Sequence, residues 1–428
     1  MQDKMKAWKV EETVKTIAEN LGKRGDVQET WERITLSKGL PGICVLLGTM
    51  MERYPKETRW GDLANRCLGK CVEHLNTHGL PGISLFSGLS GVGLGAVCAS
   101  EGLTNYRKLV GTINRQITTG VEGYTEALKK GGGTHCLLYD AIEGLSGILN
   151  YLEIFKEDNL CREALEKGVN ALVSLTGDIL VQGYRVPGWY LPAENQFSRL
   201  EQEIYPAGNF NTSLSHGVAG PLIVLSKFYS AGIRVEGQRD AIEAIVDFYR
   251  RCRSNDGRRD FWKGQIDFYE LAEEKITEKN AVRRDAWCYG APGICYALIR
   301  AGIALENREL TEYAVENLRR AMQDIRGIFS PTFCHGYAGI YQVLQSAEDC
   351  LERELFGAEK RKIRQIILDF YDPGYEFGFY NREFDREMGD WKEEETPGLL
   401  DGAAGVCLVL LENNNSCGNL WKRAFLLD

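Results

Sequence analysis

The strongest pattern in the sequence is a Gly-x-x-Gly element that is followed each time by an apolar helical stripe. The first glycines of its seven copies, separated by 46 to 73 residues, are Gly39, Gly88, Gly144, Gly217, Gly290, Gly336 and Gly402. Counted from the second glycine, the residues at +1, +4 and +5 are apolar in almost every copy, which is the spacing of one helix face. In the fourth copy the +1 residue is Pro221, which the first turn of a helix tolerates. The pattern therefore predicts seven helices that begin at these elements.

Further helical segments between these seven indicate that each repeat holds about two helices. Examples are residues 61–79, 161–180 and 309–327. Two helices in each of seven units, without a strand-rich pattern, predict an all-α array that is either an open solenoid or a closed ring. Because glycine has no Cβ atom, the paired glycines would let helices begin close together. We therefore expect a single domain over residues 1–428 that forms a seven-fold α/α toroid, a double ring of helices.

Two segments do not fit the helical pattern. Residues 184–213 contain several prolines, glycines and aromatic residues, and residues 372–397 are rich in aromatic and acidic residues. Long loops in a compact domain are often functional. We expect both segments to be irregular or inserted elements near a mouth of the fold.

The composition is that of a soluble globular protein with a sizeable core. Of the 428 residues, 44% are hydrophobic and 26% are charged, and the formal net charge of -9 argues against a nucleic-acid-binding protein. No apolar run approaches the roughly 18–20 residues of a membrane span, and the amino terminus lacks the apolar region of a secretory signal. The thirteen scattered cysteines are an odd number, which favours reduced thiols in the cytosol over a disulfide framework.

The residues directly before the first glycines are the candidates for chemistry. If the seven helices begin on one rim, their N-termini converge there with partial positive charge and unpaired N–H groups. The residues in this position are Lys38, Ser87, Glu143, His216, Tyr289, His335 and Asp401. Two of the five histidines of the chain occupy it, which favours a site at the rim.

Two copies of the element also carry cysteines. Cys288 and Cys334 each stand two residues before the first glycine, and His335 follows the second cysteine directly. Two thiolates and one imidazole are one ligand short of a closed zinc site, so they leave open the position that a catalytic zinc needs. The alternative interpretation is two buried cysteines and a histidine that caps a helix.

Three further residues are candidates for acid–base or supporting roles. His216, in the same frame one repeat earlier, is either a fourth metal ligand or a general acid or base. Asp140 could orient a histidine or take a proton, and Arg284 lies four residues before Cys288. The alternatives are a structural histidine that caps a helix for His216, a cap or a surface acid for Asp140, and a solvated surface charge for Arg284.

Two other histidine groups are interpreted as coincidental. His74 and His78 have the spacing of a helical metal pair but no third ligand nearby in the sequence. His135 and Cys136 repeat the ligand types outside the glycine frame.

Four sequence blocks resemble the signature blocks of the LanC-type lanthionine (lanthipeptide) cyclases. They are YDAIEGLSGIL at 139–149, SLSHGVAG at 213–220, AWCYGAPGI at 286–294 and FCHGYAGI at 333–340. The resemblance covers the whole chain, and the pair Trp-Cys-x-Gly and Cys-His-Gly is its most specific part. The tyrosine of Trp-Cys-Tyr-Gly, and the lack of a fused dehydratase region, resemble the stand-alone bacterial enzymes more than the eukaryotic LanC-like proteins.

The resemblance implies a zinc-dependent enzyme with a seven-fold α/α toroid. It implies zinc ligands at Cys288, Cys334 and His335, acid–base roles for His216 and Asp140, and support from Arg284. The implied substrate is a precursor peptide with a leader, whose serines and threonines have been dehydrated to dehydroalanine and dehydrobutyrine. The enzyme would add the cysteine thiols of the peptide to these alkenes and close thioether rings. The resemblance also implies a dehydratase and an exporter as partners at the inner face of the membrane.

Three competing interpretations predict different chemistry. The sites of zinc prenyltransferase-like barrels resemble an Asp-Cys-His set at a basic funnel. No comparable basic cluster lies at the glycine frames of this sequence. An α/α-barrel glycosidase would need paired carboxylates, for which Glu143 and Asp401 are available, but would leave the cysteines without a role. A zinc- and thiol-binding scaffold, similar to glutathione-binding eukaryotic relatives, predicts metal and thiol affinity without ring formation.

Overall fold

The fold is known from a computed structural model that describes residues 2–23, 31–79, 82–385, 388–412 and 419–428. The chain forms two compact units. Unit 1 comprises Met1–Gln116, Ile328–Ser346 and Glu354–Asp428, and unit 2 comprises Ile117–Gly327 and Ala347–Arg353. Each unit is described by itself.

The seven predicted apolar helices are all present. They are α2 (Leu40–Arg53), α4 (Leu89–Cys98), α6 (Leu145–Leu152), α9 (Ala219–Ser230), α12 (Ala291–Ala304), α14 (Tyr337–Leu351) and α16 (Ala403–Leu411). Six begin at the residue after the first glycine of their element, and α9 begins two residues after it. Every residue of α4, α6 and α16 is buried, so these helices supply the core rather than one amphipathic face.

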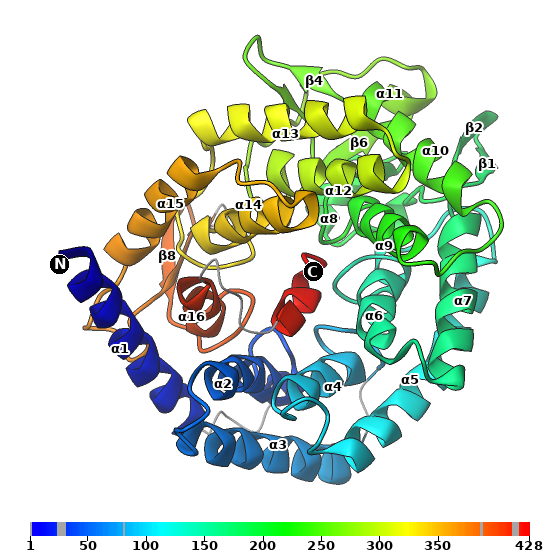
Figure 1. The fold of residues 1–428 in the computed structure, drawn as a ribbon. Helices are drawn as coiled ribbons and strands as arrows, with labels where there is room; N and C mark the ends of the chain where they lie inside the picture. Colours follow the sequence, from blue (N-terminus) through cyan, green and yellow to red (C-terminus); the bar gives the residue numbers. More distant parts are fainter. Residues whose placement is uncertain (1, 24–30, 80–81, 386–387, 413–418) are drawn as a thin grey trace. The chain divides into compact units, whose positions relative to one another are not determined.

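Seven further helices alternate with these, as the two-helix repeat predicted. They are α1 (Gln2–Lys23), α3 (Arg59–His78), α5 (Arg107–Leu128), α7 (Asn159–Ser174), α10 (Gln238–Arg251), α13 (Arg308–Gln323) and α15 (Gly357–Asp369). In unit 1, α3 packs on α2. In unit 2, α7, α10 and α13 pack on α6, α9 and α12, and α9 lies between α6 and α12 (Figure 1). The side-chain carboxylate of Asp158 and amide of Asn307 cap α7 and α13.

Backbone hydrogen bonds join the loops that precede neighbouring apolar helices. In unit 1, the N–H of Leu36 donates to the carbonyl of Phe86 over 2.8 Å. In unit 2, the N–H of Ala141 donates to Ser215 over 3.0 Å. These bonds hold each loop against the next one along its unit.

In the second and fifth copies, the second glycine of the element is what permits this approach. A Cβ atom on Gly91 would lie 2.9 Å from Leu36 Cβ, and one on Gly293 would lie 3.0 Å from Leu214 Cβ. Both contacts are with the loop of the preceding repeat in the same unit. The repeated Gly-x-x-Gly is therefore a packing requirement, because only a residue without a side chain leaves room for the neighbouring loop.

The strands are short and form antiparallel pairs. The pairs are β1 (Asp178–Val181) with β2 (Tyr184–Pro187), β3 (Asn209–Asn211) with β6 (Gln265–Asp267), β4 (Ser254–Asn255) with β5 (Asp260–Phe261), and β7 (Asn381–Asp385) with β8 (Asp390–Glu394). The segment 184–213 contains β2, a 3-10 turn (Ala193–Asn195), α8 (Arg199–Ile204) and β3, and the segment 372–397 contains the β7–β8 hairpin. The strands between 254 and 267 and the short α11 (Phe268–Ala272) were not predicted.

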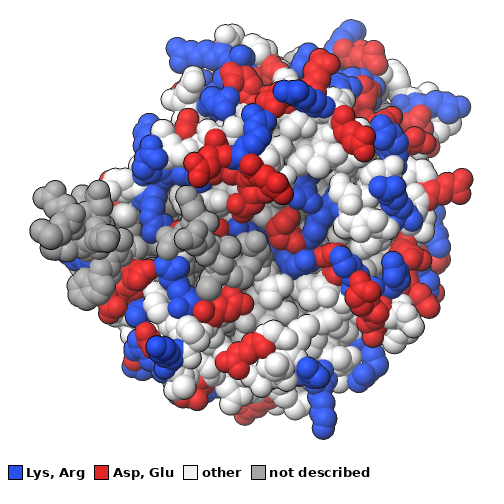
Figure 2. Space-filling model, viewed as in Figure 1, with Lys and Arg blue, Asp and Glu red and all other residues white. Residues whose placement is uncertain are grey.

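The surface carries charges of both signs. On the face shown in Figure 2, acidic and basic side chains are interspersed rather than gathered into one basic field. Among the described residues, no helix combines the length and the apolar character that crossing a membrane requires.

Candidate active site

An aspartate and a histidine from neighbouring loops of unit 2 form the centre of the site. His216 Nδ1 lies 2.7 Å from Asp140 Oδ2. The Asp140 side chain is fully buried, whereas 27% of the His216 side chain is exposed. Because Nδ1 faces the carboxylate, Nε2 is the ring nitrogen that remains for a substrate. The predicted pairing of these two residues is therefore present in the structure.

The second oxygen of Asp140 is held by the turn that starts α6. Asp140 Oδ1 accepts backbone hydrogen bonds from Ile142 over 3.1 Å, Glu143 over 2.7 Å and Gly144 over 2.7 Å. A Cβ atom on Gly144 would lie 2.2 Å from the backbone nitrogen of Asp140, so this tight turn needs glycine. These three N–H groups hold the carboxylate and fix its orientation toward His216.

The surroundings of His216 raise the pKa of its imidazole. Burial lowers this pKa, but the hydrogen bond and the negative charge of Asp140 outweigh burial, and Cys288 adds a smaller upward effect. The ring of Phe197 stands edge-on to the imidazole with 4.8 Å between centroids. The result is an oriented histidine that keeps its proton to higher pH than a free one.

Cys288 lies beside the His216 loop in the same unit. Its carbonyl accepts a hydrogen bond of 2.9 Å from the N–H of Leu214, two residues before His216. The Cys288 side chain is buried, with 5% of the residue exposed. The loops that carry Asp140, His216 and Cys288 are thus joined in order by backbone hydrogen bonds.

A buried ion pair fixes the loop that leads to Cys288. Asp285 accepts a bidentate pair from Arg259, with distances of 3.0 and 2.7 Å, and a third bond of 2.8 Å from the backbone N–H of Arg326. The neighbouring Arg284 is half-buried, and its carbonyl lies where a Cβ atom of Gly290 would be. The backbone of Arg284 is thereby packed into the turn that starts α12.

The other two predicted metal ligands belong to unit 1. Ligand atoms of Cys334 and His335 lie within 4.8 Å of each other, close enough to share one ion. The N–H of Cys334 donates to the carbonyl of Leu400 over 2.9 Å, which ties this loop to the start of α16. Because Cys288 belongs to unit 2, the meeting of all three residues at one ion is a proposal.

Cys136, which the sequence pattern left outside the site, lies beside Asp140 and His216. Its thiol lies within 4.8 Å of both Asp140 and His216, a grouping that has the residue types of a metal site. Two observations argue against metal there. Both oxygens of Asp140 already accept hydrogen bonds, and burial raises the pKa of the Cys136 thiol far above its usual value, so the thiolate is disfavoured.

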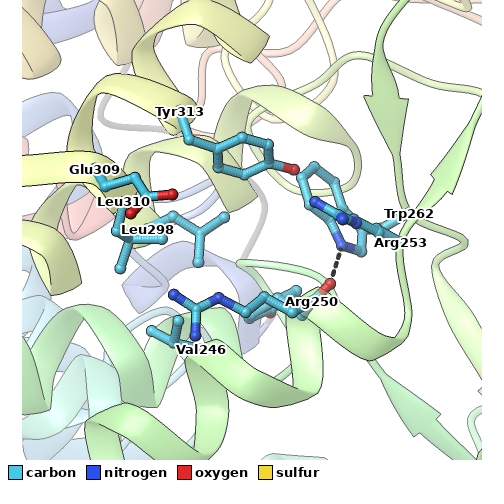
Figure 3. Close-up of a pocket in the computed structure, with 9 residues that line it drawn as sticks. Val246, Arg250, Arg253, Trp262, Leu298, Glu309, Leu310 and Tyr313 are labelled. Carbon is cyan, nitrogen blue, oxygen red and sulfur yellow. Dashed lines mark hydrogen bonds between the residues drawn. The ribbon is translucent and has the colours of Figure 1, made fainter. Parts of the chain in front are cut away.

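A separate pocket of unit 2 carries none of this chemistry. Figure 3 shows that it lies between α10, α12 and α13, with Arg250, Arg253, Trp262 and Tyr313 around it. Trp262 Nε1 donates to the carbonyl of Tyr249 across its wall over 2.8 Å. Its volume of about 140 Å³ is below the roughly 300 Å³ at which ligand pockets usually begin, so it suits one side chain rather than a peptide ring.

The repeated helical fold and the site around Asp140 and His216 agree with one class of protein. The model of the lanthionine synthetase C-like family matches residues 30–426, and the chain belongs to this family. The family predicted from the four signature blocks is therefore confirmed.

Two characterised relatives cover nearly the whole chain. The nisin biosynthesis protein NisC of Lactococcus lactis subsp. lactis is 31% identical over 395 residues, which are 92% of this chain and 89% of that protein. The solved structure of nisin cyclase matches with a TM-score of 0.83 and 29% identity over 98% of both chains. Since nisin cyclase has a helical toroid fold, the match confirms the predicted fold class.

Proposed function

We propose that the protein is a zinc-dependent lanthipeptide cyclase of the lanthionine synthetase C type. Its substrate would be a dehydrated precursor peptide with a leader, and its product a peptide with lanthionine or methyllanthionine thioether rings. The observation that carries the proposal is the pair of Asp140 and His216, 2.7 Å apart. The loop of His216 is also hydrogen-bonded to that of Cys288. Kinship with nisin cyclase supports the class of reaction.

Cys288, Cys334 and His335 would hold one zinc ion per chain. Thiolate and imidazole are preferred zinc ligands, and three protein ligands leave a fourth position for substrate. The closeness of Cys334 and His335, and the place of Cys288 beside the His216 loop, support this set. A zinc ion held there would bind the substrate thiol, lower its pKa and leave its sulfur electron-rich enough to attack.

His216 would deliver the proton that completes the addition. Attack of the substrate sulfur on the β-carbon of the dehydro residue forms the C–S bond, breaks the C=C π bond and leaves an enolate. The Nε2–H of protonated His216 would then protonate the α-carbon. The proton released by the substrate thiol would re-protonate His216, either directly or through solvent. The raised pKa of His216 suits this role because the acid form persists to higher pH than in a free histidine.

Asp140 would orient His216 rather than remove the thiol proton. It is fully buried, and both of its oxygens accept hydrogen bonds. We assign Arg284 a supporting role at the turn before Cys288, because its backbone packs against Gly290. Contact of its guanidinium with an enolate is not needed for this role.

The competing scaffold function is less well supported. It would need metal and thiol binding only, and gives no reason for a histidine that is oriented by a buried carboxylate and has a raised pKa. Association with a dehydratase and an exporter at the membrane stays a prediction of the family resemblance.

Loss of free thiols from a dehydrated lanthipeptide precursor tests the function. Ring closure leaves the peptide mass unchanged, so the remaining cysteines are alkylated and counted by mass spectrometry. We expect one alkylation to disappear for each ring in the presence of enzyme and zinc. An unchanged alkylation count, with zinc and thiol bound, would favour the scaffold.

A further inference from the structure

The β7–β8 hairpin of unit 1 is fastened to the loop that carries His335. Asn381 Oδ1 accepts hydrogen bonds from Ser330 Oγ over 2.9 Å and from Thr332 Oγ1 over 3.3 Å. Both donors lie within five residues before His335. One face of β7 therefore lies against the predicted metal-binding loop.

Glu383 is the next residue on the same face of β7. Side chains alternate along a strand, so Glu383 points to the same side as Asn381. Its Oε1 lies 3.2 Å from His335 Nε2, and Asp401 Oδ1 lies 3.7 Å from His335 Nδ1. The His335 ring, of which 12% is exposed, stands between two carboxylates.

Aromatic contacts hold the hairpin in this position from its other face. The Trp391 ring of β8 stands edge-on to Phe329 at 4.8 Å and to Phe384 at 5.6 Å, and the Arg382 guanidinium lies 4.8 Å above it. Phe329 directly precedes the Ser330–His335 loop. Both faces of the hairpin thus contact residues 329–335, which limits how far the backbone of Glu383 can move.

We infer that Glu383 is a positioning residue that orients His335 for metal binding. Its oxygen is not aligned for a hydrogen bond to Nε2 in the structure, but rotation of the side chain would let the carboxylate accept the Nε2–H, which leaves Nδ1 as the nitrogen for the metal. Histidines that bind metals commonly donate their other N–H to a carboxylate, which fixes the tautomer and the ring plane. The inference rests on the proposed function, because it takes His335 as a zinc ligand.

The distances favour Glu383 over Asp401 for this role. The 3.2 Å separation is within hydrogen-bonding reach, whereas 3.7 Å is beyond it. The Glu383 side chain is 43% exposed and can rotate to align its oxygen, and such bonds often tighten only when a site is filled. Asp401 instead directly precedes Gly402 at the start of α16.

Zinc affinity of the full chain, measured by competition with a chromogenic chelator, tests the inference. We expect Glu383→Ala to weaken zinc binding about 10- to 100-fold, as is typical when such a partner is lost. Glu383→Gln, which can still accept the N–H, should recover most of the affinity. The control is Glu394→Ala on β8, an exposed residue of the same hairpin, which should bind zinc as the wild type does.

The controls separate failure of the inference from failure of the proposed function. If wild type binds zinc, His335→Ala does not, and Glu383→Ala matches wild type within twofold, the orienting role is wrong and the metal site stands. If wild type binds no zinc, both are wrong. Equal losses in Glu383→Ala and Glu383→Gln, with Glu394→Ala unaffected, would also overturn the hydrogen-bond role.

Discussion

The Asp140 carboxylate lies 2.7 Å from Nδ1 of His216, and its other oxygen accepts three backbone N–H groups at the start of α6. This relationship fixes the orientation of the imidazole and raises its pKa at the same time. An oriented histidine whose pKa is raised suits the role of a general acid.

Replacement of Asp140 by asparagine should lower the pKa of His216. Burial alone lowers that pKa, and the carboxylate is what reverses the effect, so the raised value should be lost. The acid form of His216 exists only below its pKa, and the alkaline limb of the pH–rate profile should therefore move to lower pH. NMR titration of His216 and the pH dependence of ring closure measure the two effects. An unchanged His216 pKa in Asp140→Asn would contradict this account.

His216→Asn should bind zinc as the wild type does and lose ring closure. Loss of a general acid typically costs about 10²- to 10⁴-fold in rate. Zinc content and the rate of thiol loss are measured on the same preparation. Normal turnover would rule out the acid role, and loss of zinc would instead make His216 a ligand.

The buried pair of Arg259 and Asp285 should be important for stability. Arg259 is 3% exposed, and its removal would leave the Asp285 charge buried with only backbone partners. Loss of one member of such a pair costs about 3–5 kcal/mol. Arg259→Ala should lower the free energy of unfolding by this amount in urea titrations. The neighbouring, exposed Arg258 provides the control, and Arg258→Ala should change it by less than about 0.5 kcal/mol.

Two glycine-to-alanine changes should have opposite effects on the free energy of unfolding. Gly91 lies in the first turn of α4. An added Cβ would lie 2.2 Å from the Leu85 carbonyl oxygen and 2.9 Å from Leu36 Cβ. Gly91→Ala should cost about 1–3 kcal/mol through overpacking. Gly69 lies within α3 with open space around it, so Gly69→Ala should stabilise the chain by about 0.5–1 kcal/mol. Stability that is equal in the two variants would show that the glycines are not packing requirements.

The sequence could predict the helical fold because its repeat has a direct physical cause. Second glycines such as Gly91 and Gly293 meet the preceding loop, and the same spacing and apolar stripe return in almost every copy. The short strands between 254 and 267 could not be predicted, because each has only two or three residues and β6 pairs with a strand that is distant in the sequence. The β3–β6 pair, for example, joins residues about 55 positions apart.

The site was predictable where residues share the repeat frame and unpredictable elsewhere. His216 and His335 stand directly before a first glycine, and Asp140 lies four residues before Gly144 in a signature block. Cys136 and Glu383 lie outside the frame. In the structure the Cys136 thiol lies beside Asp140, and the β7 strand brings Glu383 to His335. The proximity of His135 and Cys136 to Asp140 in the sequence was the one signal that could have found the first of them.

The zinc content of the wild type and of Cys334→Ala tests the central claim most directly. Cys407→Ala is the matched control, because Cys407 is fully buried in α16 and burial raises the pKa of its thiol far above the usual value. Elemental analysis should give about one zinc per chain in wild type and Cys407→Ala, and none in Cys334→Ala. A carefully prepared wild type without zinc, or a Cys334→Ala variant that retains it, would contradict the proposed site.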